Sequence, residues 1–236
     1  MKVAIVTGSS SGIGRSIALQ LAQLKYSLVL TGRNEKKLAQ LKPIIKENDV
    51  ECLTVAADLE NENAAAHIIE RAINQFGQID LLVNNAGMAH ASPISETDSD
   101  SWDRIFRINA RAPFLLCKKA VPYLKKSENP VIINIGSVVG FKGYVGQAAY
   151  SASKHALTGF TKVLAKEVQD DGISVHLISP GGVNTSMATE MRPDIDTENL
   201  ILPEEIAELV GFLATRKGRG TMDHFYIRRK NGLAFD

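Results

Sequence analysis

The chain has 236 residues, of which 27 are Lys or Arg and 26 are Asp or Glu, so its formal net charge is +1. This length suits one α/β domain with a sizeable core, and the near-neutral charge gives no support for nucleic acid or an acidic membrane as a partner. No apolar stretch is long enough to cross a bilayer, and the chain starts directly in a strand-like run. We therefore expect neither a membrane segment nor a signal peptide.

Cysteine and histidine usage limits the chemistry further. Cys52 and Cys117 lie in strand-like and helix-like apolar runs, as expected for buried thiols in a reducing compartment, and we expect a cytoplasmic protein. The five histidines are scattered, and none has ligand spacing with a cysteine or a carboxylate. The sequence therefore predicts no metal site.

Strand-like apolar runs alternate with runs of helical periodicity along the whole chain. Strands are expected at residues 3–7, 27–31, 51–56, 81–84, 131–135 and 174–179, with a weaker one at 224–228. Helices are expected at residues 14–24, 35–47, 61–76, 99–126, 150–169 and 204–213. Strict β–α alternation predicts a parallel sheet with helices on both faces. No linker or repeat divides residues 1–236, which we expect to form a single domain.

A glycine-rich turn follows the first expected strand. The sequence TGSSSGIG at residues 7–14 stands between that strand and the first helix. Glycines permit a tight turn and a close approach by a ligand, and the helix N-terminus favours a pyrophosphate. A small-residue turn without a ligand is the alternative, but the strand–turn–helix order favours a dinucleotide site.

Tyr150 and Lys154 lie four residues apart, and so share one face of an expected helix. An unperturbed phenol has a pKa of about 10, and an adjacent ammonium favours the phenolate, which brings the phenol within reach of proton transfer. A YxxxK string also occurs by chance on surface helices. The pair gains weight from its neighbours in the sequence, because other polar residues follow the expected strands.

Seven motifs together resemble the short-chain dehydrogenase/reductase family, in its compact one-domain branch. They are TGSSSGIG (7–14), Asp58-Leu59, NNAG (84–87), Asn109, the serine of IGS (135–137), YSASK (150–154) and PGGVNT (180–185). Each motif is weak alone, but all seven stand in the family's order and spacing up to about residue 215. The resemblance implies a Rossmann-type doubly wound sheet of about seven mainly parallel strands.

The resemblance also implies a role for each matching residue. Tyr150 would be the general acid/base, Lys154 would lower the pKa of the phenol and hold the nicotinamide ribose, Ser137 would hold the substrate oxygen, and Asn109 would anchor a proton-relay water. The implied cofactor-binding residues are Gly8, Ser10, Ser11, Gly12, Ile13, Gly14, Arg33, Asp58, Leu59, Asn85, Ala86, Gly87, Tyr150, Lys154, Pro180, Gly181, Val183 and Thr185. Singly, Ser137 could cap a turn, Asn109 could bond to backbone, and Asp58 could be the N-cap of the next helix.

The end of the second expected strand bears on the cofactor. An NAD site usually places an acid there to accept the ribose hydroxyls, whereas this chain has Gly32 and Arg33. A guanidinium can pair with a 2′-phosphate, so NADP(H) is favoured and NAD(H) stays open. Many NADP-preferring relatives carry a basic residue where this chain has Ser11, and Arg15 could serve instead.

The sequence predicts an NADP(H)-dependent oxidoreductase that acts on a carbonyl or secondary alcohol. The alternatives are a 3-oxoacyl-carrier-protein-type reductase, a non-catalytic dinucleotide-binding sensor, and an epimerase or dehydratase. Residues 186–202 are expected to cover the substrate, and acids at 194 and 196 would disfavour anionic substrates. The basic run 228–230 is expected to be a solvated terminus. Helices 99–126 and 150–169 would form a dimer or tetramer interface.

Overall fold

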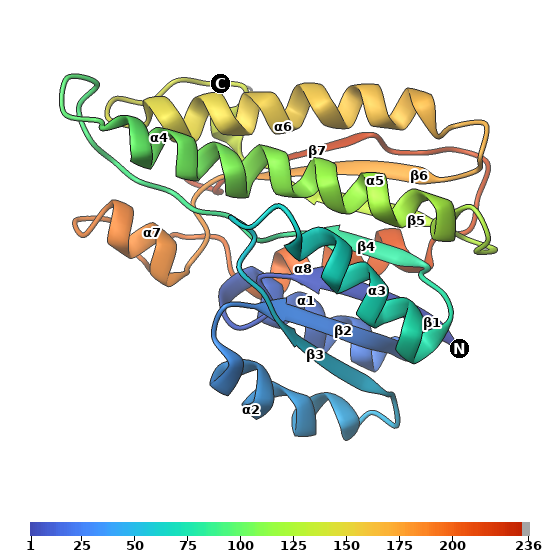
Figure 1. Cartoon of the computed structure of the whole chain (residues 1–236). Helices are drawn as coiled ribbons and strands as arrows, with labels where there is room; N and C mark the ends of the chain where they lie inside the picture. Colours follow the sequence, from blue (N-terminus) through green and yellow to red (C-terminus); the bar gives the residue numbers. More distant parts are fainter. Residues whose placement is uncertain (233–236) are drawn as a thin grey trace.

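The computed structural model describes residues 1–232, which form one seven-stranded sheet with helices on both faces (Figure 1). The strands are β1 (Lys2–Thr7), β2 (Tyr26–Gly32), β3 (Cys52–Ala56), β4 (Leu81–Asn84), β5 (Val131–Ile135), β6 (Ser174–Pro180) and β7 (His224–Ile227). Their order in the sheet is β3-β2-β1-β4-β5-β6-β7, and each adjacent pair is parallel. The predicted doubly wound Rossmann-type fold is confirmed.

The helices form a layer on each side of the sheet. They are α1 (Gly12–Gln23), α2 (Glu35–Lys46), α3 (Ala64–Phe76), α4 (Ser99–Phe106), α5 (Ala112–Leu124), α6 (Ala148–Glu167), α7 (Ser186–Met191) and α8 (Pro203–Thr215). Buried apolar residues of α1, α2 and α8 pack in one core, whereas those of α3, α5 and α6 pack in the other. In β1, Ala4 and Val6 face the first core while Val3 and Ile5 face the second, as the two-residue side-chain period of a strand requires. Both faces of the sheet are therefore buried under helices, which explains why the strands are continuous apolar runs.

One predicted helix is interrupted. The structure divides residues 99–126 into α4, a π-helical segment η1 (Arg107–Arg111) and α5. The extra residue in a π turn lets Asn109, which is fully buried, reach a partner outside its own helix. The structure also contains a helix that the sequence did not predict. This helix, α7, lies inside the expected covering segment and beyond the carboxyl ends of the strands (Figure 1).

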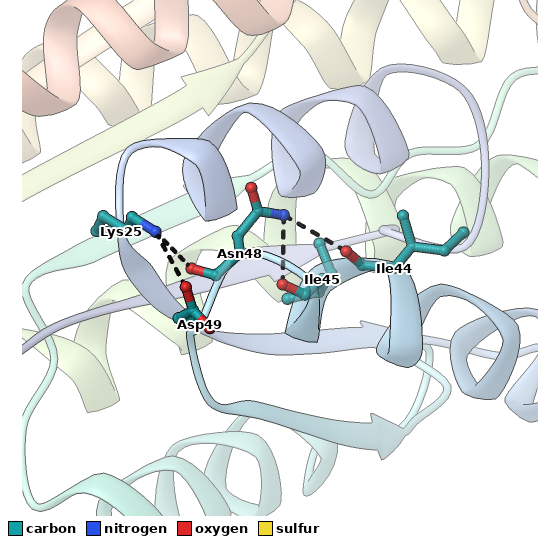
Figure 2. Close-up of polar contacts among 5 residues, drawn as sticks. All are labelled: Lys25, Ile44, Ile45, Asn48 and Asp49. Atoms are coloured by element: carbon teal, nitrogen blue, oxygen red, sulfur yellow. Dashed lines mark hydrogen bonds and ion pairs between the residues drawn. The ribbon is translucent and has the colours of Figure 1, made fainter.

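At the opposite, amino-terminal edge of the sheet, the turns before β2 and β3 adopt a left-handed backbone without glycine. Lys25 and Asp49 have positive φ angles of 65° and 56° in the turns that precede β2 and β3. The Lys25 ammonium donates to the Asn48 carbonyl at 2.8 Å, and the Asn48 amide donates to the carbonyls of Ile44 and Ile45 at the end of α2 (Figure 2). These bonds hold the two left-handed turns together, far from the carboxyl edge.

Within residues 1–232, the helices are all too short or too polar to cross a membrane. Cys52 and Cys117 are free, buried thiols, and burial raises their pKa values to about 11 and about 12. They are therefore protonated packing residues at neutral pH.

Candidate active site

The glycine-rich turn has the backbone geometry that its sequence indicated. Gly8 and Gly12 adopt positive φ angles of 66° and 52°, a region that residues with a Cβ rarely enter. A Cβ on Gly14 would collide with the Gly8 carbonyl oxygen and the Asn85 amide. The turn thus needs glycine for two different reasons, conformation at Gly8 and Gly12 and close packing at Gly14.

The turn is tied to the end of β4, at the point where the strand order reverses. The Thr7 hydroxyl accepts from the backbone N–H groups of Asn85 and Ala86 at 2.9 and 3.0 Å. The Asn85 side chain donates to the Thr7 carbonyl at 2.8 Å. Adjacent parallel strands whose connections run in opposite directions leave a crevice at their carboxyl ends, where such folds bind dinucleotides.

Asn109 is buried beside this crevice and binds the backbone of Met88. Its side-chain oxygen accepts from the Met88 N–H at 2.8 Å, and its NH₂ group donates to the Met88 carbonyl at 2.7 Å and to the Ser153 hydroxyl at 3.0 Å. Both amide donors are thus used within the protein, and Oδ1 can accept one further bond. Asn109 therefore fixes the chain after the NNAG motif, and a water could bond it only as a donor to Oδ1 or through the backbone of η1.

Ser137, Tyr150 and Lys154 converge from two elements. Ser137 follows β5 and hydrogen-bonds the Tyr150 phenol, while its Oγ lies 3.5 Å from the Pro180 carbonyl. Lys154, one turn after Tyr150 on α6, is 4% exposed and donates to the Ile135 carbonyl at 2.9 Å. Its Nζ lies 5.9 Å from the centre of the Tyr150 ring. The group unites a hydroxyl donor, a phenol and a cation at one edge of the sheet.

Burial has the largest effect on the pKa values of Tyr150 and Lys154. Burial raises the pKa of Tyr150, and the hydrogen bond with Ser137 lowers it only in part. Burial also lowers the pKa of Lys154 to about 8. The lowering of the phenol pKa by Lys154 stays a prediction, and in the free chain the ammonium bonds to the Ile135 carbonyl.

A cleft of about 880 Å³ runs from the glycine-rich turn to α7. It is lined by most of the predicted site residues: Gly8, Ser10, Ser11, Gly12, Ile13, Arg33, Asp58, Leu59, Asn85, Ala86, Gly87, Ser137, Tyr150, Lys154, Pro180, Gly181, Val183 and Thr185. Gly14 and Asn109 are buried behind its wall. Asp58 is not the N-cap of α3, which begins six residues later at Ala64; its carboxylate accepts instead from the Glu60 N–H at 3.1 Å.

The far end of the cleft holds residues that sequence reasoning missed. Lys142, Arg192, Arg228 and Arg229 line it, so the run 228–230 is not merely a solvated terminus. Of the two acids expected near the mouth, Asp194 forms a two-pronged ion pair with Arg192 at 2.9 Å, whereas Asp196 is exposed. The signal was available: residues that follow β7 must lie at the same edge as those that follow β6. Among residues 1–232 no cluster of His, Cys, Asp or Glu could hold a metal ion.

A doubly wound sheet with a glycine-rich turn at its switch point and a Ser–Tyr–Lys group beside it defines a dehydrogenase-type dinucleotide site. The chain belongs to the short-chain dehydrogenase family, whose sequence model matches residues 2–196, and it is an oxidoreductase of that family.

Relatives match over nearly the whole chain. An uncharacterized oxidoreductase of Bacillus subtilis is 31% identical over 93% of each chain. A 3-oxoacyl-[acyl-carrier-protein] reductase of Staphylococcus epidermidis is 34% identical over 92% of this chain and 93% of its own. A crystal structure of a metagenomic short-chain oxidoreductase in complex with NADP is 30% identical, covers 98% of each chain and superposes with a TM-score of 0.85.

Proposed function

We propose that this chain transfers a hydride between NADP(H) and a carbonyl or secondary alcohol, with Tyr150 as the general acid/base. The observation that carries the proposal is the convergence of Ser137, Tyr150 and Lys154 in the wall of the cleft that the glycine-rich turn opens. The nicotinamide would supply or accept the hydride. The protein's own residues then have to orient the carbonyl and move one proton.

Each of the three side chains has a distinct role. The Ser137 hydroxyl points at the phenol and can donate to an oxygen on which negative charge develops. Tyr150 is neutral near pH 7 because the ordinary pKa of a phenol is 10.0 and burial raises it further, so the phenol can give a proton to the nascent alkoxide. Lys154, with a pKa of about 8, is largely protonated at pH 7 and stabilises the phenolate that remains.

NADP(H) is the cofactor that the cleft fits best. At the end of β2 the cleft is lined by Thr31, Gly32 and Arg33, with no acid at the position where NAD sites place one. The Thr31 hydroxyl is buried and has no hydrogen-bond partner in the described structure, as is suitable for a site completed by a ligand. The relative solved with NADP supports the same choice.

Two further proposals concern the covering segment and assembly. Residues 186–202 would cover the substrate as part of a single domain of residues 1–236, and α7 within this segment has no buried residue, which leaves it free to move. The chain would self-associate as a dimer or tetramer, because Phe114 of α5 and Val163 of α6 are 45% and 54% exposed on neighbouring helices. Light scattering at micromolar concentration should find an oligomer, and a monomer would refute this.

Three alternatives remain to be separated from this function. The Staphylococcus epidermidis relative is named as a 3-oxoacyl-[acyl-carrier-protein] reductase, which would use the same proton and hydride chemistry on a carrier-bound thioester. A non-catalytic sensor would bind NADPH without turning it over. A third class, an epimerase or dehydratase, would return the hydride and leave NADPH unchanged.

The experiment is NADPH absorbance with purified protein over ketones, aldehydes, oxo acids, β-ketoesters and their carrier-type thioesters. Tyr150→Phe should bind NADPH nearly as well as the wild type but lose at least about a hundredfold in kcat, the scale of general acid–base catalysis. NADPH binding without oxidation by any substrate would support a sensor, or an epimerase or dehydratase. A Tyr150→Phe variant with near-normal kcat would refute the assigned proton donor.

A further inference from the structure

The cleft is far more basic than the chain as a whole. Among residues 1–232, seven Lys or Arg residues and two acids, Asp58 and Glu190, line the cleft, whereas the whole chain has 27 basic and 26 acidic residues. Part of this positive charge lies beside the glycine-rich turn. The rest lies beyond Pro180, where the loop after η2 (Val138–Gly140), α7 and the end of β7 form what we call the substrate half.

Strand register places Arg229 in the substrate half. β7 pairs with β6 so that Pro180 lies opposite Ile227, and the Gly181 N–H donates to the Ile227 carbonyl at 2.7 Å. The next residues of each strand therefore emerge side by side. The Arg229 side chain passes over Gly182, where a Cβ would stand 3.8 Å from Arg229 Cδ. Since Ser137 Oγ lies 3.5 Å from the Pro180 carbonyl, this guanidinium and the reacting group share one wall of the cleft.

Arg228 holds the turn that carries Arg229. One terminal nitrogen of Arg228 donates to the carbonyls of Arg229, Lys230 and Gly232 at 3.0, 3.2 and 2.9 Å. The Gly232 N–H closes the same turn onto the Arg229 carbonyl at 3.0 Å. The two arginines thus have different roles, because Arg228 holds the turn whereas Arg229 is half-buried in the lining of the cleft.

The two aspartates near Arg229 have other partners within residues 1–232. Asp194 pairs with Arg192 and removes that one cation from the balance. Asp196 is exposed and accepts from the Glu198 N–H at 2.9 Å and the Asn199 side chain at 2.6 Å, although it also lies in the field of Arg229. Among residues 1–232 no acid forms an ion pair with Arg229, so its guanidinium keeps its positive charge in the substrate half.

We propose that the substrate carries a carboxylate in addition to its reacting carbonyl, and that Arg229 binds this carboxylate while the carbonyl meets Ser137 and Tyr150. This inference rests on the proposed function. A guanidinium presents a planar fork of donors that matches a carboxylate, so Arg229 supplies orientation as well as charge. Substrates of this class are oxo acids and their hydroxy-acid counterparts.

The test compares oxo acids with their own methyl esters, which share the reacting carbonyl and lack the charge. A series with one, two or three bonds between carbonyl carbon and carboxyl carbon covers the unknown reach of Arg229. The proteins are the wild type, Arg229→Gln, Arg229→Lys and Arg219→Gln, the last being an exposed arginine outside the cleft. The measured quantity is the acid-to-ester ratio of kcat/KM with NADPH, with a thermal melt for each variant.

For at least one chain length the wild type should favour the acid by at least about tenfold, an energy of about 1.4 kcal/mol, mainly through KM. Arg229→Gln should bring this ratio close to one, Arg229→Lys should keep part of it, and Arg219→Gln should keep all of it. Esters reduced as well as the acids, an unchanged ratio in Arg229→Gln, or a phosphopantetheine thioester preferred over every acid would overturn the inference alone. NADPH binding with no oxidation by any compound would overturn the proposed function and this inference with it.

Discussion

Lys154 offers a test in which stability and activity move in opposite directions. Replacing it by Met removes a cation that is 4% exposed and whose pKa burial lowers from 10.5 to about 8. Because the folded-state pKa lies below the unfolded one, the buried charge destabilises the fold fully below pH 8, and this penalty fades as the pH rises from about 8 to 10.5. Lys154→Met should therefore stabilise the free protein near pH 7 while it disables the site.

The size of the gain follows from two opposing terms. A pKa difference of this size corresponds to about 3 kcal/mol at about 1.4 kcal/mol per unit. The lost hydrogen bond to the Ile135 carbonyl offsets about 1 kcal/mol of it. The net gain of about 2 kcal/mol should raise the Tm at pH 7 by about 4–8 °C for a chain of this length. By about pH 10 the remaining penalty for the buried charge and the lost hydrogen bond should nearly cancel, so the two proteins should be about equally stable.

The assay is urea unfolding of the cofactor-free protein at pH 7, 8, 9 and 10, with wild type and variant compared at each pH. The matched control is Lys166→Met on the same helix, whose exposed side chain should give no pH-dependent difference. The same Lys154→Met protein should bind NADPH more weakly, and any residual alcohol oxidation should have its alkaline limb at higher pH. A variant less stable than wild type at pH 7, or a stability difference independent of pH, would refute this reasoning.

The cofactor half of the cleft supports two further tests. Gly14→Ala should weaken NADPH binding at least tenfold and lower the free energy of unfolding by about 1–3 kcal/mol, because the added Cβ would collide with the backbone at Gly8. The control is Gly159→Ala on α6, where a Cβ meets nothing within 4 Å; this variant should be mildly stabilising. Fluorescence titration and thermal melts measure both, and a Gly14→Ala protein that binds normally would contradict the close-packing argument. Arg33→Ala should raise KM for NADPH about ten- to a hundredfold and leave NADH nearly unchanged, whereas Gly32→Asp should shift preference towards NADH. A wild type that already prefers NADH would show that Arg33 is only surface charge.

The sheet could be predicted from the sequence because its strands are buried on both faces. Such strands are short apolar runs, and the seven predicted runs correspond to the seven strands with small differences at their ends. Helix 99–126 was predicted as continuous because its periodicity is local, whereas the break at η1 depends on Asn109 reaching Met88. That demand is tertiary, and no spacing of apolar residues reveals it. Helix α7 was missed for the converse reason, since it buries no residue and so leaves no periodic apolar signal.

The two halves of the cleft differ in how much their sequence reveals. The cofactor half is built from backbone turns and short motifs, so its residues are contiguous and Gly8 or Tyr150 can be recognised locally. The substrate half is built from segments that meet only through the sheet. Arg229 looks like terminal surface charge until β7 is placed parallel to β6, and only then does it lie beside Gly182. The weak alternation of a sheet-edge strand concealed that placement, although the rule that ligands bind beyond the carboxyl ends of strands applies to β7 as it does to β1. The substrate contact that we propose therefore comes from residues that follow the last strand, which are the hardest to place from sequence.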